Sequence, residues 1–314
     1  MNARKFKEIC ATLAGKVSSR LHAGSGERRV ILCFHSVHPT AKHSSIRPEA
    51  FERIMRWLAE NVELMDVVSL INGTGNPTSK PAVALTFDDG HRDNLTHALP
   101  IARDHGASFC TYVMTGLLEG DSRVRERFRA QLRLKSEDFE ALTWDDAEAM
   151  VEQGCSIGSH TWDHPMLSHL PPDGIEFQLA ISKDLLEKRL GLKRIGMCYP
   201  YGKIGRNVNE TAIRTAERLG YDYGLCVEHR GLRPREDRFA IPRFIIIDDN
   251  LEKLRRQISG EEDYHGFVSR HMPEFLAKKL SRADYHEADD ALPPVSGHPL
   301  WSKAGFDVPN CIQP

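Results

Sequence analysis

Two adjacent carboxylates, Asp88 and Asp89, directly follow the apolar run Val-Ala-Leu-Thr-Phe and precede Gly90. Because side chains alternate along an extended chain, the two carboxylates point in different directions and can take different roles. One can bind a metal ion while the other acts beside it as a base. Gly90 lets the backbone turn sharply out of the strand. The alternative interpretation is an ordinary turn in which an aspartate caps a helix.

Two histidines, His160 and His164, lie four residues apart in the segment Ser-His-Thr-Trp-Asp-His-Pro. This spacing places both imidazoles on one side of a short turn and falls within the range of zinc ligands. Pro165 disfavours a continued helix at His164. No Glu follows His160, which argues against the helical H-E-x-x-H site of metalloproteases. Surface or structural histidines are the alternative.

Together, Asp89, His160 and His164 offer three ligands and leave a position for water, which is the pattern of a catalytic metal site. Asp88 is the candidate base that takes the proton of that water. His35, which follows Val-Ile-Leu-Cys-Phe, is the candidate general acid that protonates a leaving amine. These residue types therefore indicate metal-dependent hydrolysis of an amide.

Short apolar runs precede each of these residues and predict the strands that must position them. The predicted strands cover residues 29–34, 82–87, 108–114, 155–158, 195–199, 223–227 and 239–247. Amphipathic stretches between them predict helices that begin at Pro48 and after Thr143, and others at about 173–190, 207–219 and 250–258. This alternation predicts a parallel α/β sheet with its active site at the carboxyl ends of the strands. Residues 116–141 are charged and predict an irregular excursion above the sheet.

The composition excludes several classes of protein. Of the 314 residues, 40% are hydrophobic and 27% charged, which is an ordinary globular balance. The 42 basic and 44 acidic residues give a net charge of -2, which argues against a nucleic-acid partner. The seven cysteines are odd in number and form no CxxC pair, so we interpret them as small buried residues that stay reduced.

Three regions are expected along the chain. Residues 1–27 contain a basic amphipathic helix over 4–21, which either lies on an anionic membrane surface or packs on the protein's own body. Residues 28–260 form the catalytic domain, and residues 261–314 form a C-terminal extension whose role the sequence does not indicate. The lack of a secretory signal and of a long apolar run predicts a cytoplasmic protein, with the inner face of the membrane as the place of any peripheral contact.

Three motifs in order give the chain a resemblance to the polysaccharide deacetylase family (carbohydrate esterase family 4, the NodB-homology domain). Thr-Phe-Asp-Asp-Gly at 86–90 is similar to the first family motif, Ser-His-Thr-Trp-Asp-His at 159–164 to the second, and Tyr-Pro-Tyr-Gly at 199–202 to the third. The resemblance covers roughly residues 28–250. It implies a distorted, incomplete (β/α) barrel of about seven strands.

The resemblance also implies roles for individual residues. Asp88 would be the base, and Asp89, His160 and His164 would hold one divalent metal ion. Zinc is the expected metal, with cobalt, nickel and manganese as alternatives that the ligand set does not exclude. Tyr201 would direct its backbone N–H to the oxyanion and its ring to the substrate groove.

The chain departs from the common family pattern in two places. Cys198 stands where the third motif usually has an Arg, and no convincing Leu-x-x-His motif follows residue 240. However, Phe-His-Ser-Val at 34–37 resembles the opening of another branch, which includes poly-N-acetylglucosamine deacetylases and has a permuted strand order. There an early histidine serves as the acid, which implies this role for His35. Arg243, in Ile-Pro-Arg-Phe, would orient the base, with a surface ion pair as the alternative.

Two further residues near the motifs have open interpretations. Trp162, between the two histidines, is expected either to form a wall of the groove and stack on a sugar, or to pack in the core. His91 is expected in solvent or at a helix cap.

The expected function is removal of an N-acetyl or similar N-acyl group from an amino sugar in a polysaccharide, an oligosaccharide or a lipid-linked precursor. Two alternatives remain: a metal-dependent amidase that acts on a formyl amide or a non-sugar amide, and a catalytically silent carbohydrate-binding protein. The expected partner is the carbohydrate or glycolipid substrate, and residues 4–21 are the candidate for membrane contact.

Overall fold

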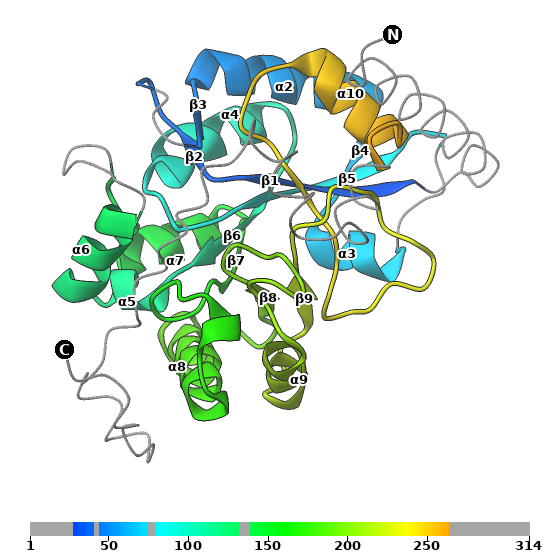
Figure 1. Cartoon of the computed structure of the whole chain (residues 1–314). Helices are drawn as coiled ribbons and strands as arrows, with labels where there is room; N and C mark the ends of the chain where they lie inside the picture. Colours follow the sequence, from blue (N-terminus) through cyan, green and yellow to red (C-terminus); the bar gives the residue numbers. More distant parts are fainter. Residues whose placement is uncertain (1–27, 41–43, 75–78, 132–138, 264–314) are drawn as a thin grey trace, which may run out of the picture.

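A curled, parallel β-sheet lies at the centre of the computed structural model, which describes residues 28–263 except 41–43, 75–78 and 132–138 (Figure 1). Its strands are β1 Arg29–Phe34, β4 Glu63–Leu64, β5 Ala82–Phe87, β6 Cys110–Val113, β7 Ser156–Ser159, β8 Gly196–Cys198, β9 Tyr223–Leu225 and β10 Phe244–Ile245. Among the described residues, seven strands follow the order β10-β1-β5-β6-β7-β8-β9, and β4 pairs with β5. The pairs are parallel throughout. The expected distorted, incomplete barrel is confirmed.

The segment before β10 spans the opening between the last and the first strand of this order. Ile241 forms a parallel bridge with Leu225 of β9, while Phe244 pairs with Leu32 of β1. Arg243 lies between these two attachment points. The sheet therefore presents Arg243 from the segment that joins its two edges, and its side chain is fully buried.

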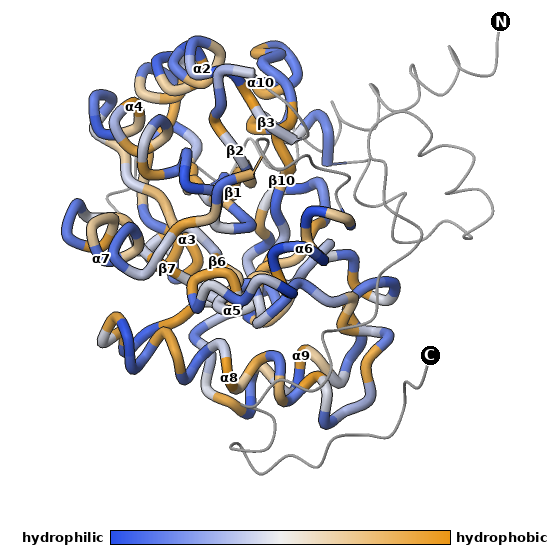
Figure 2. Tube along the Cα trace, turned by 90° about the vertical axis from the view of Figure 1, so that its left-hand side faces the viewer, coloured by the Kyte–Doolittle hydropathy of each residue, from blue (hydrophilic) through white to orange (hydrophobic). Residues whose placement is uncertain are grey.

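Helices cover the outside of the curled sheet (Figure 1). They are α2 Pro48–Asn61, α3 Val67–Asn72, α4 Leu99–Asp104, α5 Thr115–Leu118, α6 Ser122–Gln131, α7 Trp144–Glu152, α8 Pro172–Leu190, α9 Glu210–Arg218 and α10 Leu251–Ser259. Hydrophobic and hydrophilic stretches alternate along α8 and α9, as expected for helices with one buried face (Figure 2). The predicted capping box at the start of α7 is present, with Thr143 and Asp146 bonded reciprocally.

The expectation of irregular structure over residues 116–141 is wrong for residues 116–131, because this part contains α6 and most of α5. In α6, Val124 and Phe128 are four residues apart and buried, although arginines surround them in the sequence. They pack with Trp162, Phe177 and their neighbours in a separate hydrophobic cluster. The many charged residues of α6 obscured its narrow apolar face in the sequence. This helix also supplies Arg127, which supports the turn before His164.

Large side chains fill the inside of the barrel below the strand ends. The hydroxyl groups of Tyr112 and Tyr223 lie 2.8 Å apart, and both rings are buried. Gly158 and Gly196 make room for these rings, since a Cβ at either position would lie within 2.4 Å of a tyrosine carbon. The interior is therefore a packed floor rather than a channel.

A second, two-stranded sheet of β2 Ser36–Val37 and β3 Ser45–Ile46 lies beside the barrel. The predicted helix over 4–21 and residues 264–314 of the predicted extension lie outside the described residues. Within the described part of the chain, no helix is long and apolar enough to cross a membrane.

Candidate active site

The residues with candidate chemistry meet at the carboxyl edge of the sheet, because parallel strands end on the same side. His35 directly follows β1, Asp88 and Asp89 follow β5, and His160 follows β7. The backbone at this edge is unusual. Five described residues other than glycine have a positive φ, and four of them lie here, with φ between 59° and 73°: Asp89, Thr161, His164 and Tyr201. Such conformations cost about 1–3 kcal/mol each and persist at functional sites where the surrounding structure holds them.

The metal-ligand cluster consists of Asp89, His160 and His164, all of them buried. Asp89 Oδ1 lies 3.4 Å from His160 Nε2 and 3.6 Å from His164 Nε2. His160 Nδ1 lies 2.8 Å from the carbonyl oxygen of Cys198. When Nδ1 donates its proton to this carbonyl, Nε2 carries the lone pair that a metal requires. An Asp and two His are a donor set that suits a divalent transition metal, so the residues fit such an ion.

The charges of two of the three members of the metal-ligand cluster, His164 and Asp89, agree with metal binding. Burial would lower the pKa of His160, but its hydrogen bond with Asp89 and the nearby carboxylates raise it. Burial and the neighbouring His160 lower the pKa of His164 to about 3, so its imidazole is neutral near pH 7. Burial would raise the pKa of Asp89, but hydrogen bonding to His160 and the proximity of His91 hold it well below the usual range. An ionised carboxylate beside a neutral imidazole matches the protonation state that metal binding requires.

Side chains from two helices, α6 and α8, support the turn that carries His164. The backbone N–H of His164 donates to Thr161 Oγ1 at 3.0 Å. Gln178 of α8 accepts from the backbone N–H of Asp163, and Arg127 of α6 forms a buried ion pair with the Asp163 carboxylate. Neither Arg127 nor Gln178 lies in a sequence motif, so neither was expected near the site. The one sequence feature that could have indicated Arg127 is the helical spacing of the buried residues Val124 and Phe128 on either side of it.

The base cluster consists of Asp88, Arg243, Cys33 and Cys198, all of them buried. Arg243 binds both oxygens of Asp88, with Nη1 2.8 Å from Oδ1 and Nη2 2.8 Å from Oδ2. Burial would raise the pKa of Asp88, but the charge and hydrogen bonds of Arg243 hold it well below the usual range. The role of Arg243 in orienting the base stays a prediction, which this bidentate contact supports.

Two thiols complete the base cluster. Cys33 Sγ lies 3.4 Å and Cys198 Sγ 3.3 Å from Asp88 Oδ2. Cys198 Sγ also lies 2.9 Å from Arg243 Nη2. The guanidinium of Arg243 thus contacts Cys198, the residue that stands where the third family motif usually has an Arg. The interpretation of the cysteines as buried and free is confirmed for the five that the structure describes, but it missed the contacts of these two with Asp88.

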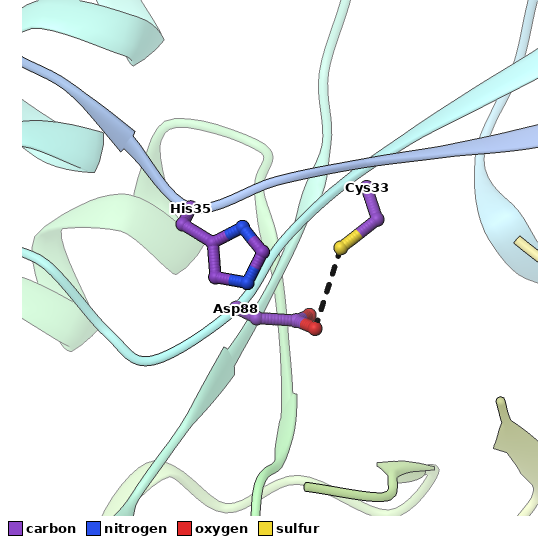
Figure 3. Close-up of side chains that lie close together, drawn as sticks. All are labelled: Cys33, His35 and Asp88. Atoms are coloured by element: carbon purple, nitrogen blue, oxygen red, sulfur yellow. Dashed lines mark hydrogen bonds between the residues drawn. The ribbon is translucent and has the colours of Figure 1, made fainter. Parts of the chain in front are cut away.

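His35 lies beside the base cluster, with its imidazole near the carboxylate of Asp88 (Figure 3). A His35 ring nitrogen, Cys33 Sγ and an Asp88 oxygen all lie within 4.8 Å of one another. Burial lowers the pKa of His35, and the charges of Asp89 and Asp88 offset only part of this effect. The buried Nδ1 of His35 has no hydrogen-bond partner among the described residues.

Three other residues flank the two clusters. The Tyr201 ring lies 4.8 Å from that of His164 between centroids, next to the metal-ligand cluster. Trp162 has no exposed surface and packs with Phe128 and its neighbours, which favours the core over a groove wall. The expectation that His91 lies in solvent or caps a helix is wrong. Its ring is buried against Phe139, with Nε2 3.8 Å from Asp89 Oδ2.

Comparison with known proteins places this geometry in a family. Residues 75–224 match the family model described as polysaccharide deacetylase. The Bacillus subtilis protein YxkH is 27% identical over 216 residues, which cover 68% of this chain and 69% of that protein. The poly-β-1,6-N-acetyl-D-glucosamine N-deacetylase of Staphylococcus epidermidis is 21% identical over 232 residues, which cover 71% of this chain and 75% of the enzyme.

A solved structure agrees with the sequence matches. The Streptococcus pyogenes deacetylase PplD, determined in complex with acetate, aligns with a TM-score of 0.61 and 26% identity. The alignment covers 74% of this chain and 98% of that one. Members of the family are hydrolases that act on N-acetyl groups of amino sugars. From the matched motifs, the curled sheet and the site at its carboxyl edge, we conclude that the chain contains a domain of the polysaccharide deacetylase family.

Proposed function

We propose that this protein is a metal-dependent deacetylase that hydrolyses the N-acetyl group of an amino sugar in a polysaccharide or oligosaccharide. The observation that carries the proposal is the arrangement of Asp88 and His35 beside Asp89, His160 and His164 at one edge of the sheet. These five side chains supply a base, an acid and a three-ligand metal site. They are the parts that amide hydrolysis requires.

Asp89, His160 and His164 would hold the metal ion, and zinc suits this donor set. When bound, the ion supplies a Lewis acid that makes water nucleophilic near neutral pH and polarises the acyl oxygen. Asp88 takes the proton that this water loses as its oxygen bonds to the acyl carbon. Because Arg243 keeps Asp88 ionised, the carboxylate is ready to accept a proton over the whole neutral range.

The acyl carbon–nitrogen bond then breaks, and the nitrogen needs a proton in order to leave as an amine. His35 is the proposed donor, since its imidazole lies near Asp88 and has a free buried nitrogen. Acetate and the amine are the products, and Asp88 releases its proton to reset the site. Tyr201, whose ring lies against His164, is the proposed wall of the sugar site and the backbone donor to the oxyanion.

The proposed substrate class rests on the relatives. Poly-β-1,6-N-acetyl-D-glucosamine deacetylases match about seven-tenths of this chain, and PplD was determined with acetate. A β-1,6-linked N-acetylglucosamine oligomer is therefore the first substrate to test, and a β-1,4-linked chito-oligosaccharide is the comparison.

The test combines metal analysis with acetate release by the purified full chain. We expect one divalent ion per chain and acetate release that chelation abolishes and zinc restores. A chain that binds no metal, with the metal-ligand cluster intact, would overturn the mechanism. A chain that binds metal but releases acetate from neither oligomer would overturn the substrate class and turn attention to lipid-linked and non-sugar amides.

A further inference from the structure

The two oxygens of Asp88 differ in the number of hydrogen-bond donors around them, because both thiols of the base cluster lie near the same oxygen. Oδ2 lies within hydrogen-bonding distance of three donors: Arg243 Nη2 at 2.8 Å, Cys198 Sγ at 3.3 Å and Cys33 Sγ at 3.4 Å. Oδ1 has one donor among the described residues, Arg243 Nη1 at 2.8 Å. A carboxylate oxygen offers about two lone pairs, so Oδ2 is saturated while Oδ1 retains capacity.

We propose that Cys33 and Cys198 are positioning residues that donate hydrogen bonds to Asp88 Oδ2, and that they thereby make Oδ1 the oxygen that takes the proton of the attacking water. This inference rests on the proposed function and deepens it. The two thiols approach Oδ2 from strands on either side of β5, Cys33 from β1 and Cys198 from β8. With Arg243, they fix the carboxylate plane from three directions.

The direction of the Cys198 hydrogen bond follows from its contacts. The guanidinium of Arg243 has no acceptor, so Nη2 must donate to Cys198 Sγ across their 2.9 Å contact. The thiol proton is then free to point to Asp88 Oδ2. Both thiols are fully buried, and burial favours the neutral thiol over the thiolate, so each carries a proton to donate.

A metal ion held by Cys33, His35 and Asp88 is the competing interpretation, since their ligand atoms lie within 4.8 Å of one another. Two features argue against it. Both Asp88 oxygens are already bound to the permanently charged Arg243, which repels a second cation. In addition, a metal needs a thiolate, whereas burial favours the neutral thiol of Cys33.

The kinetic test replaces each thiol by Ala and by Ser in the full chain loaded with zinc. A hydroxyl can donate the same hydrogen bond, so the Ser variants should keep kcat within about twofold of the unchanged protein. The Ala variants should lose about tenfold in kcat with KM and metal content unchanged, as expected for loss of one hydrogen bond to a charged group. Cys155→Ala is the matched control, because this buried thiol lies directly before β7, at the end opposite to His160.

A spectroscopic test is independent of turnover. The S–H stretching band of each thiol is isolated as the infrared difference between the unchanged protein and its Ala variant. We expect the bands of Cys33 and Cys198 at lower frequency than that of Cys155, because a hydrogen bond to a carboxylate weakens the S–H bond. Asp88→Asn should move both bands upwards.

The outcomes separate the inference from the proposed function. Lowered S–H bands in a protein that releases no acetate would support the thiol contacts and overturn the activity. An active protein whose Ala variants match Cys155→Ala, or whose S–H bands do not differ from that of Cys155, would overturn the inference. A second equivalent of zinc that is lost in Cys33→Ala would replace it with the metal interpretation.

Discussion

The base cluster and the metal-ligand cluster are built around adjacent aspartates and yet differ in almost every property. Asp88 is held by donors at 2.8 to 3.4 Å, all supplied by the protein. Asp89 lies 3.4 to 3.8 Å from the nitrogens of three neighbouring imidazoles, farther than the 2.8 Å at which Arg243 binds Asp88. The carboxylate of Asp88 is satisfied by donors of the fold itself, whereas that of Asp89 lies among imidazoles, as the proposed metal site requires.

The backbone shows the same contrast. Asp89 and His164 have left-handed backbone conformations, whereas Asp88 and the members of its cluster do not. The difference teaches that strain at this site is concentrated where ligands must be aimed at a common point. The base needs a fixed charge, and ordinary strand geometry with one buried Arg provides it.

Replacing each aspartate by asparagine should give the largest effects and should separate the roles of the two clusters. Asp89→Asn removes a charged ligand, so we expect loss of bound metal and of acetate release. Asp88→Asn keeps the metal-ligand cluster and should retain the metal, while turnover falls by about 10²–10⁴-fold through loss of the base. Metal analysis and acetate release on both variants check this. If Asp88→Asn lost the metal as fully as Asp89→Asn, the two roles would have been assigned the wrong way round.

Removal of Arg243 should have the next largest effect, on stability. Arg243→Met leaves the buried Asp88 without its partner, and we expect the free energy of unfolding to fall by about 3–5 kcal/mol at neutral pH. The folded pKa of Asp88 is lowered, so its contribution to stability is present above the unfolded pKa of about 3.9 and is lost as the pH falls below it. The difference between the two proteins should therefore shrink in acid, as measured by denaturant unfolding.

Arg214→Met is the matched control for that experiment. It removes an arginine whose partners, Glu210 and Glu217, lie on the exposed side of α9. Such surface pairs contribute about 0–1 kcal/mol. Equal losses in the two variants would mean that the base cluster contributes no more to stability than a surface ion pair.

The smallest expected effect concerns His35 and is a shift of the alkaline limb of the pH–rate profile. Burial lowers its pKa, so the protonated acid disappears at a lower pH than for a free histidine. The alkaline limb of kcat/KM should therefore have an apparent pKa below about 6.5. His35→Ala should lower the rate and remove this limb, while metal content stays unchanged. A variant with an unaltered pH profile would assign the acid role to another group.

Local sequence patterns predicted much of this protein. The strand ranges 29–34 and 82–87 agree with β1 and β5 residue for residue, and the capping box at Thr143 is present. Asp88, Asp89 and His160 could be identified because they come at the carboxyl ends of predicted strands. A residue at the carboxyl end of a parallel strand reaches the active edge whatever the rest of the fold does.

Local sequence patterns did not predict the supporting contacts, because these contacts join distant segments. The role of Arg243 beside the base was expected from the family resemblance alone. Arg243 contacts Asp88 across 155 positions, and Cys198 does so across 110. Nothing in the neighbourhood of either residue reveals such a partner. Arg127 was missed for a further reason, since the many charges of α6 concealed its helical spacing.

The sequence alone therefore determined the strand–helix alternation, the position of the active edge and the identity of the residues that follow the strands. These depend on spacing over a few residues, which local backbone geometry fixes. Only the tertiary structure showed that two buried thiols surround Asp88, that Arg243 binds both of its oxygens, and that His91 approaches Asp89. Those contacts depend on how the sheet curls and on how the segment around Arg243 joins its two edges, and no local pattern encodes that geometry.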